Sequence, residues 1–112
     1  MGPVTLEGTG SGLRVSQSET LGGTADVRTV GLSLGQLAAA KAFFAGSAYS
    51  DPAGEAAPLV IEWIDDKVRL AQTIGAGGQK RLVVVVLNAA QVAAAKTWFA
   101  SSNPTSPQTL TP

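Results

Sequence analysis

The side chains that could do chemistry in this sequence are Ser, Thr, Lys, Asp and Glu, because the chain contains no Cys and no His. Without thiol or imidazole there is no Ser-His-Asp or Cys-His arrangement and no common zinc ligand set. No group titrates near neutral pH without environmental tuning, and no nucleophile has an evident base. We therefore predict that the protein is not an enzyme and that it has no catalytic residues, no cofactor and no metal.

The one carboxylate cluster is Glu62, Asp65 and Asp66, whose oxygens are suitable ligands for calcium or magnesium. Asp is also a common turn residue, and this cluster falls between two expected strands, so we interpret it as a solvated turn. The glycine-rich segments 8–12 and 75–80 lack the G-x-x-x-x-G-K-[ST] spacing of a phosphate loop. We expect hairpin turns at both.

Basic side chains form the second candidate site. Arg14 and Arg69 recur on two expected strands together with Gln17 and Gln72. A sheet face carrying such residues could follow a phosphate backbone. Alternatively, this is the solvated side of a sheet, on which the arginines pair with acidic residues of the adjacent strand. We favour the second interpretation, because base stacking needs exposed aromatic side chains.

Most aromatic residues belong to expected helices, which leaves Trp63 and Tyr49. Trp63 stands where the first half of the chain has Gly8, so it either fills an asymmetry in the core or anchors a contact with another chain. The candidate interface residues are therefore Trp63, Tyr49, Arg14, Arg69, Lys67, Lys80 and Arg81.

An internal duplication organises the chain. When residues 3–57 are laid over residues 58–112 without a gap, 17 of 55 positions are identical, against roughly four expected by chance. We therefore predict a single α+β domain over 1–112 with pseudo-twofold symmetry, in which two βββα repeats pair their strands into a sheet and pack two helices. Repeat one covers 3–47, a linker 48–57, repeat two 58–102, and a C-terminal tail 103–112.

Each repeat reads as three strands and a helix. First strands are expected at 4–7 and 59–62, alternating second strands at 13–17 and 68–72, and third strands at 26–32 and 81–87. The pairs Gly22-Gly23 and Gly77-Gly78 predict the turns between second and third strands. The run 82–87 is apolar on both faces, so we expect that strand to be central or covered on both sides.

The helices carry clear start and stop signals. Ser33 and Asn88 are the expected N-caps, Gly46 ends the first helix and Asn103-Pro104 the second. The expected apolar stripes include Leu34, Leu37, Ala40 and Phe44 in the first helix and Val92, Ala95, Trp98 and Phe99 in the second.

Composition narrows the class of protein further. The 112 residues are 45% hydrophobic and 14% charged, which is typical of a globular domain. Lys and Arg balance Asp and Glu at eight each, so the electrostatic footprint of a nucleic-acid or anionic-membrane binder is missing. The first residues do not resemble a signal peptide, and no apolar run is long enough to span a membrane. We expect a soluble protein of the cytoplasm or of a virion, without membrane partners.

The strand-to-helix joints at 30–37 and 85–92 resemble those of single-stranded-DNA-binding domains of the PUR-repeat, Whirly and positive-cofactor-four type. This resemblance implies paired units of several strands and a helix that bind single-stranded nucleic acid. The sequence departs from that pattern because it lacks a basic excess and strand aromatics.

Two functions follow as expectations. The first is a non-enzymatic structural or assembly module that contacts protein, either itself or a larger assembly, such as a capsid-decoration or tail-associated subunit. Residues 3–57 carry three basic and five acidic side chains and residues 58–112 carry five basic and three acidic ones; this is either drift or complementarity between neighbouring molecules in a ring or lattice. The alternative is a pseudo-dimeric binder of single-stranded nucleic acid.

Overall fold

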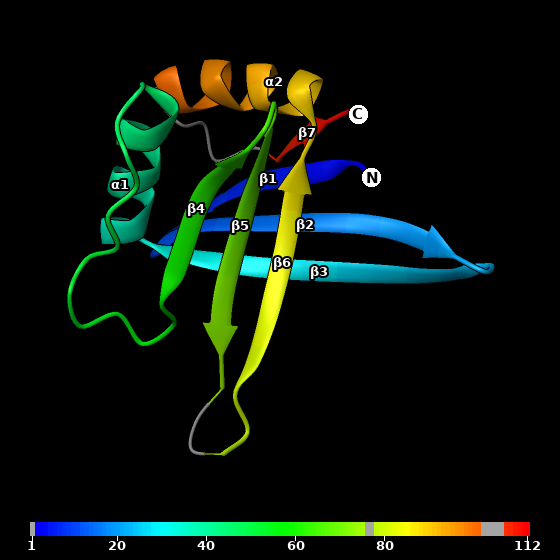
Figure 1. Cartoon of the computed structure of the whole chain (residues 1–112), viewed down its shortest axis with the longest axis horizontal. Helices are drawn as coiled ribbons and strands as arrows, with labels where there is room; N and C mark the ends of the chain where they lie inside the picture. Colours follow the sequence, from blue (N-terminus) through cyan, green and yellow to red (C-terminus); the bar gives the residue numbers. More distant parts are fainter. Residues whose placement is uncertain (1, 76–77, 102–106) are drawn as a thin grey trace.

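A computed structural model describes residues 2–75, 78–101 and 107–112. Over these residues the chain forms an α+β domain with two antiparallel sheets and two helices (Figure 1). In chain order the elements are β1 (Val4–Thr9), β2 (Gly12–Leu21), β3 (Thr24–Ser33), α1 (Leu34–Phe44), β4 (Leu59–Ile64), β5 (Lys67–Ile74), β6 (Arg81–Leu87), α2 (Ala89–Ala100) and β7 (Gln108–Leu110).

The strands do not form the one sheet that was expected. Sheet A has the order β3-β2-β1-β7 and sheet B the order β4-β5-β6. The two sheets cross one another, and the hairpins β2–β3 and β5–β6 extend in different directions away from the helices (Figure 1). β3 and β6 are edge strands that contact each other. They share no backbone ladder, so the two sheets are separate.

The core lies between the inner faces of the sheets and the helices. Burial alternates along β1 and at the start of β4, as the period of two requires. Rings of α1 and α2 close one side: Phe44 and Phe99 are stacked with centroids 4.7 Å apart and planes 10° apart. The remaining large core side chains include Leu6, Leu13, Val15, Val30, Leu59, Ile61, Leu70, Val85, Leu87 and Trp98.

Both predicted helix starts are confirmed. The Ser33 and Asn88 side chains each accept a hydrogen bond from the backbone N–H three residues on, at Gln36 and Gln91. The two glutamine side chains return the bond by accepting from the backbone N–H of the cap residue, which completes a capping box. The stripe expected on α1 is wrong at Leu34, which is 63% exposed.

The predicted turn at Gly22-Gly23 is also confirmed. These two residues join β2 to β3 with φ of 58° and 83°, and Leu21 pairs with Thr24 across them. A two-residue hairpin loop of this kind needs positive φ at both positions, which glycine adopts without steric cost. Gly77 of the matching turn at Gly77-Gly78, and the helix stop at Asn103-Pro104, lie outside the described residues.

The third strand of the second repeat departs from its prediction. β6 is an edge strand of sheet B, and one of its faces is not covered by the chain. Leu82 is 63% exposed and Val84 and Val86 are only partly buried. The physical reason is that α1, α2 and sheet A all pack on the inner face of sheet B, where Val85 and Leu87 are buried.

Part of the predicted C-terminal tail forms a strand. Residues 108–110 form β7, which pairs with β1 in the register Val4↔Leu110, Thr5↔Thr109 and Leu6↔Gln108. Leu110 is only 1% exposed, and its carbonyl oxygen accepts a hydrogen bond from Gln91 Nε2 at 3.1 Å. One apolar residue with a partner on α2 is enough to order this segment, although it has no long hydrophobic pattern.

Replacing Leu110 with Ala is expected to lower the free energy of unfolding by about 2–3 kcal/mol, because it leaves a cavity beside α2. Thr109→Ala, on the same strand but exposed, is the control and should change stability little. Urea denaturation followed by circular dichroism measures both. Equal effects of the two variants would mean that β7 does not belong to the core.

Neither helix in the described part of the chain is long and apolar enough to cross a membrane.

Candidate functional site

The basic candidate residues do not gather on one surface. The side chains of Arg14 and Arg69 form cross-strand ion pairs with Glu7 and Glu62, and the first pair is 2.9 Å apart. Arg14 lies on sheet A and Arg69 on sheet B. The interpretation of these arginines as partners for acidic residues of the adjacent strand is therefore confirmed, and each has part of its charge neutralised.

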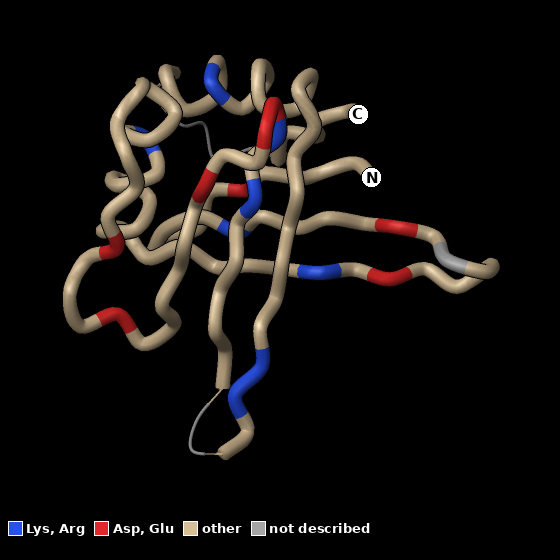
Figure 2. The backbone as a smooth tube through the Cα atoms, viewed as in Figure 1, with Lys and Arg blue, Asp and Glu red and all other residues tan. Residues whose placement is uncertain are grey.

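The other three basic candidates lie at opposite ends of sheet B. Lys67 opens β5 beside Asp66, with Nζ 3.4 Å from Oδ1. Lys80 and Arg81 lie at the far end of the β5–β6 hairpin, where Figure 2 shows a blue segment away from red ones. Among the residues that the structure places, no carboxylate lies within ion-pairing distance of Lys80 or Arg81.

Gln17 and Gln72 are not on a solvated sheet face, as the sequence suggested, but are each 1% exposed. They follow the inward alternation of β2 and β5, and each side-chain amide bonds the backbone of the opposite sheet. Gln17 Nε2 donates to Val86 O at 2.7 Å and its Oε1 accepts from Val86 N at 3.1 Å. Gln72 makes the same two bonds to Gly31, at 2.6 and 2.9 Å.

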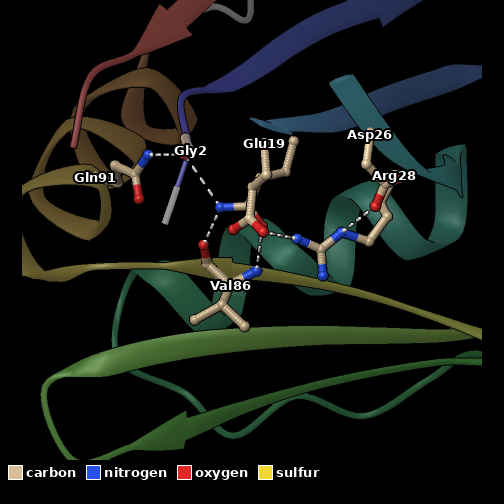
Figure 3. A network of polar contacts seen from close by, with 7 residues as sticks. Gly2, Glu19, Asp26, Arg28, Val86 and Gln91 are labelled. Carbon is tan, nitrogen blue, oxygen red and sulfur yellow. Dashed lines mark hydrogen bonds and ion pairs between the residues drawn. The ribbon is translucent and has the colours of Figure 1, made fainter. Parts of the chain in front are cut away.

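The glutamines of the capping boxes extend this network. Gln36 Nε2 donates to Ala57 O at 2.9 Å and Gln91 Nε2 to Gly2 O at 3.0 Å. Gln17 and Gln72 donate to the same two carbonyls, each at 3.2 Å. Figure 3 shows the bond between Gln91 and Gly2 and, beside it, the bonds at Val86. Buried side-chain amides therefore join both sheets and both helices, which is a structural role.

Sheet A also carries an ion-pair cluster on the β2–β3 hairpin. Arg28 on β3 lies 2.7 Å from Glu19 and 3.9 Å from Asp26 (Figure 3). All three residues belong to the β2–β3 hairpin. The cluster therefore stabilises one hairpin and does not present a free cation.

Trp63 packs at the edge of the core, as the first of the two interpretations predicts. Its ring lies 5.7 Å from that of Phe43 on α1, and Lys96 Nζ of α2 lies 5.5 Å from its centroid. The side chain is nevertheless 48% exposed. Trp63 thus closes the edge of the core between β4 and the helices and leaves about half of its surface to solvent.

Tyr49 is half-buried in the linker and packs against the core. Its hydroxyl donates a hydrogen bond to Asp51 Oδ1 at 2.7 Å, and the same oxygen accepts from Gln36 Nε2 at 3.2 Å. Burial, the bond to Asp51 and the charges of Asp51 and Glu55 raise the pKa of Tyr49 above its ordinary value of 10.0. Tyr49 therefore fastens the linker to α1, and this contact does not depend on a partner chain.

We predict that stability falls as the pH rises above about 10, because the unfolded chain ionises Tyr49 before the folded chain does. Tyr49→Phe should lose about 1 kcal/mol at neutral pH with the hydrogen bond and should lack this part of the alkaline decline. Denaturant titrations from neutral to alkaline pH measure both effects. Parallel curves for the two proteins would show that Tyr49 is not the group responsible.

The outer faces of the two sheets differ in chemistry. On sheet A, the register row Thr5↔Ser16↔Thr29 carries hydroxyls, and Ser16 Oγ lies 3.1 Å from Thr29 Oγ1. On sheet B, the row 55 positions later is Val60↔Ala71↔Val84, which is aliphatic. Cross-strand partners share a face of the sheet.

Aliphatic side chains occupy much of this face of sheet B, which also carries the Glu62–Arg69 ion pair, Lys67 and Thr73. Val60 is 53% exposed, Ile64 42% and Leu82 63%, and Val86 takes the place that Gly31 has on sheet A. We call the aliphatic part of this face the B face, and its members are Val60, Ile64, Ala71, Leu82, Val84 and Val86, of which Ala71 is buried. This face was not predicted from the sequence, although the difference between positions 5, 16 and 29 and positions 60, 71 and 84 indicates it.

A metal site has no support in the geometry. Asp65 has a φ of 58°, and the Asp65-Asp66 turn joins β4 to β5 as expected. Within residues 2–75, 78–101 and 107–112, no group of three or more Asp or Glu side chains is placed to hold an ion.

No family model, curated protein sequence or solved structure matches the chain. The geometry of its own residues is therefore the basis for assigning a function.

Proposed function

We propose that this protein is a non-enzymatic assembly module that contacts another protein through the B face. The observation that carries the proposal is the aliphatic row Val60, Ala71 and Val84 on the outer face of sheet B, in which Val60 is exposed, Val84 is partly buried and Ala71 is buried on the central strand. A contiguous exposed apolar patch is uncommon on a soluble monomer and is typical of an interaction site. The apolar run 82–87 predicts a strand covered on both sides, and a partner would supply the second cover.

We also infer that the domain is a duplicated βββα unit with pseudo-twofold symmetry. Gln17 bonds Val86 and Gln72 bonds Gly31 in the same way, and all of these positions correspond at the offset of 55. The capping boxes repeat with that offset as well. In such a duplicate the hydroxyl face of sheet A and the B face are corresponding surfaces that differ in chemistry.

The alternative, binding of single-stranded nucleic acid, receives less support. Arg14 and Arg69 are paired with carboxylates on different sheets. Lys67 and Lys80 lie at opposite ends of sheet B. A backbone-tracking groove needs cations along one path with aromatic platforms beside them, and the aromatic rings described above pack around α1 and α2.

Site-specific photocrosslinking tests the proposal with a control that the chain itself provides. A benzophenone side chain is placed at Val60 on the B face or at its counterpart Thr5 on sheet A. We expect protein adducts, mapped by mass spectrometry to one recurrent segment, from position 60 and not from position 5. The same yield at both positions, or no adducts from position 60 in the purified protein and in the cells that make it, contradicts the proposal. Nuclease-sensitive adducts would favour the alternative.

A further inference from the structure

We infer that the occupant of the B face is a second copy of this chain, packed face to face in antiparallel orientation; this rests on the proposed function of that face. The argument uses the charges at the two ends of sheet B and the position of the aliphatic row between them.

The two ends of sheet B differ in charge. The β4–β5 turn carries Asp65 and Asp66, both exposed, beside Lys67, which pairs with Asp66 and leaves a net charge of −1; the opposite end carries Lys80 and Arg81, both exposed. Figure 2 shows the red turn and the blue segment at opposite ends of this sheet. β5 runs between them from Lys67 to Ile74, a length of about 23 Å.

A twofold axis in the plane of the sheet and perpendicular to its strands brings these ends together. It places each acidic turn over the basic end of the other copy, so the contact forms twice. An axis parallel to the strands would instead place Asp65 and Asp66 over their own copies, which is repulsive. The charge pattern therefore favours the antiparallel arrangement.

The apolar residues fit the same axis. Val60 lies five residues before Asp65 and Val84 four residues after Lys80, so the aliphatic row is near the middle of the face. Under the antiparallel axis this row packs on its own copy. Val86 then lies over Leu82 of the other copy, and the Glu62–Arg69 ion pair, which shares the row of Val86, lies over the row of Thr73.

The size of the face sets the strength of the association. Three strands about 23 Å long and about 4.8 Å apart cover roughly 300 Å² in plan. This is below the roughly 800 Å² per partner of a stable standard interface. We therefore expect a reversible dimer whose population depends on protein concentration and decreases with salt.

Charge exchange tests the orientation. The acidic variant Lys80→Glu/Arg81→Glu carries negative charge at both ends, and the basic variant Asp65→Asn/Asp66→Lys carries positive charge at both. Asn is used at 65 because it tolerates the positive φ of that residue. By sedimentation velocity at low salt, each variant alone should lose the dimer, and an equimolar mixture should regain it as a heterodimer. A mixture that stays monomeric overturns the antiparallel pairing.

The role of the B face is tested by replacing its aliphatic row with the hydroxyl residues found at the corresponding positions of sheet A. Val60→Thr/Ala71→Ser/Val84→Thr should weaken dimerisation by about tenfold or more, while Val27→Thr on sheet A, also exposed, should not. Circular dichroism confirms folding of each variant. Dimerisation equal to that of the wild type in the triple variant overturns the inference. If the wild type is monomeric and position 60 gives adducts to a different protein, the inferred dimer is wrong and the proposed function stands. If the wild type is monomeric and position 60 gives no adducts, both the dimer and the proposed function are wrong.

Discussion

Replacing Gln72 with Leu is expected to lower the free energy of unfolding by about 3 kcal/mol. The substitution removes the partners of the Gly31 N–H and carbonyl, and one of the two donors to the Ala57 carbonyl, which keeps its bond from Gln36. Each buried polar group left without a partner costs roughly 1–3 kcal/mol, and a new apolar contact does not restore it. Gln17→Leu should have a similar effect, because Gln17 makes the matching bonds to Val86 and Gly2.

Urea denaturation is the measurement, with Gln79→Leu as the control. Gln79 is exposed near the tip of the β5–β6 hairpin, so its replacement should change stability by less than about 0.5 kcal/mol. If Gln72→Leu were as mild as this control, the side-chain amides would not be what joins the two sheets.

The variant Gln72→Glu adds a pH test of the same contact. A carboxylate there would be buried and would face two carbonyl oxygens, so the pKa of the new group in the folded chain should be raised. Both states are protonated at acid pH, and stability is highest there. It should fall as the pH rises above about 4.3, where the unfolded chain begins to ionise. A stability profile equal to that of the wild type from acid to neutral pH would contradict this environment.

The second large effect is expected at the contact between the helices. Phe99 is 7% exposed and stacks on Phe44 while meeting Trp98 edge to face. Phe99→Ala should cost about 3–5 kcal/mol through lost burial and the cavity that remains. This is a large part of the about 5–15 kcal/mol that a domain usually has.

Phe99→Leu and Leu34→Ala provide the comparison for this variant. Phe99→Leu keeps most of the volume and should cost less, and Leu34→Ala removes an exposed side chain and should cost little. Thermal and urea unfolding of the three variants should therefore rank them in that order. If Leu34→Ala lowered the free energy of unfolding as much as Phe99→Ala, the face of α1 that contacts α2 would not be the one described here.

Local patterns in the sequence predicted the elements well where one residue type has one strong local role. Ser33, Asn88 and Gly22-Gly23 have such roles in caps and a tight turn, and the structure confirms them. The ion pairs of Arg14 and Arg69 follow from cross-strand neighbours in a simple hairpin register. These inferences need only contacts close in the chain.

Contacts between distant segments were not predictable in the same way. Gln17 looked like a surface residue because an amide is polar, and only its alternation with Leu13 and Val15 indicates the inward face. Its partner Val86 is far away in sequence and belongs to the other sheet. β6 was expected to be central because hydropathy indicates that a face should be covered, but it does not say whether the cover comes from the same molecule.

The pairing of β7 with β1 also has a mechanical consequence. Val4 lies opposite Leu110, so a force that pulls the two ends of this domain apart acts across the first rung of the ladder. Antiparallel strands loaded in this way unzip one hydrogen-bonded pair at a time instead of sharing the load. Under tension, β7 should therefore detach from β1 at low force and add to the end-to-end length, while the two crossed sheets stay folded.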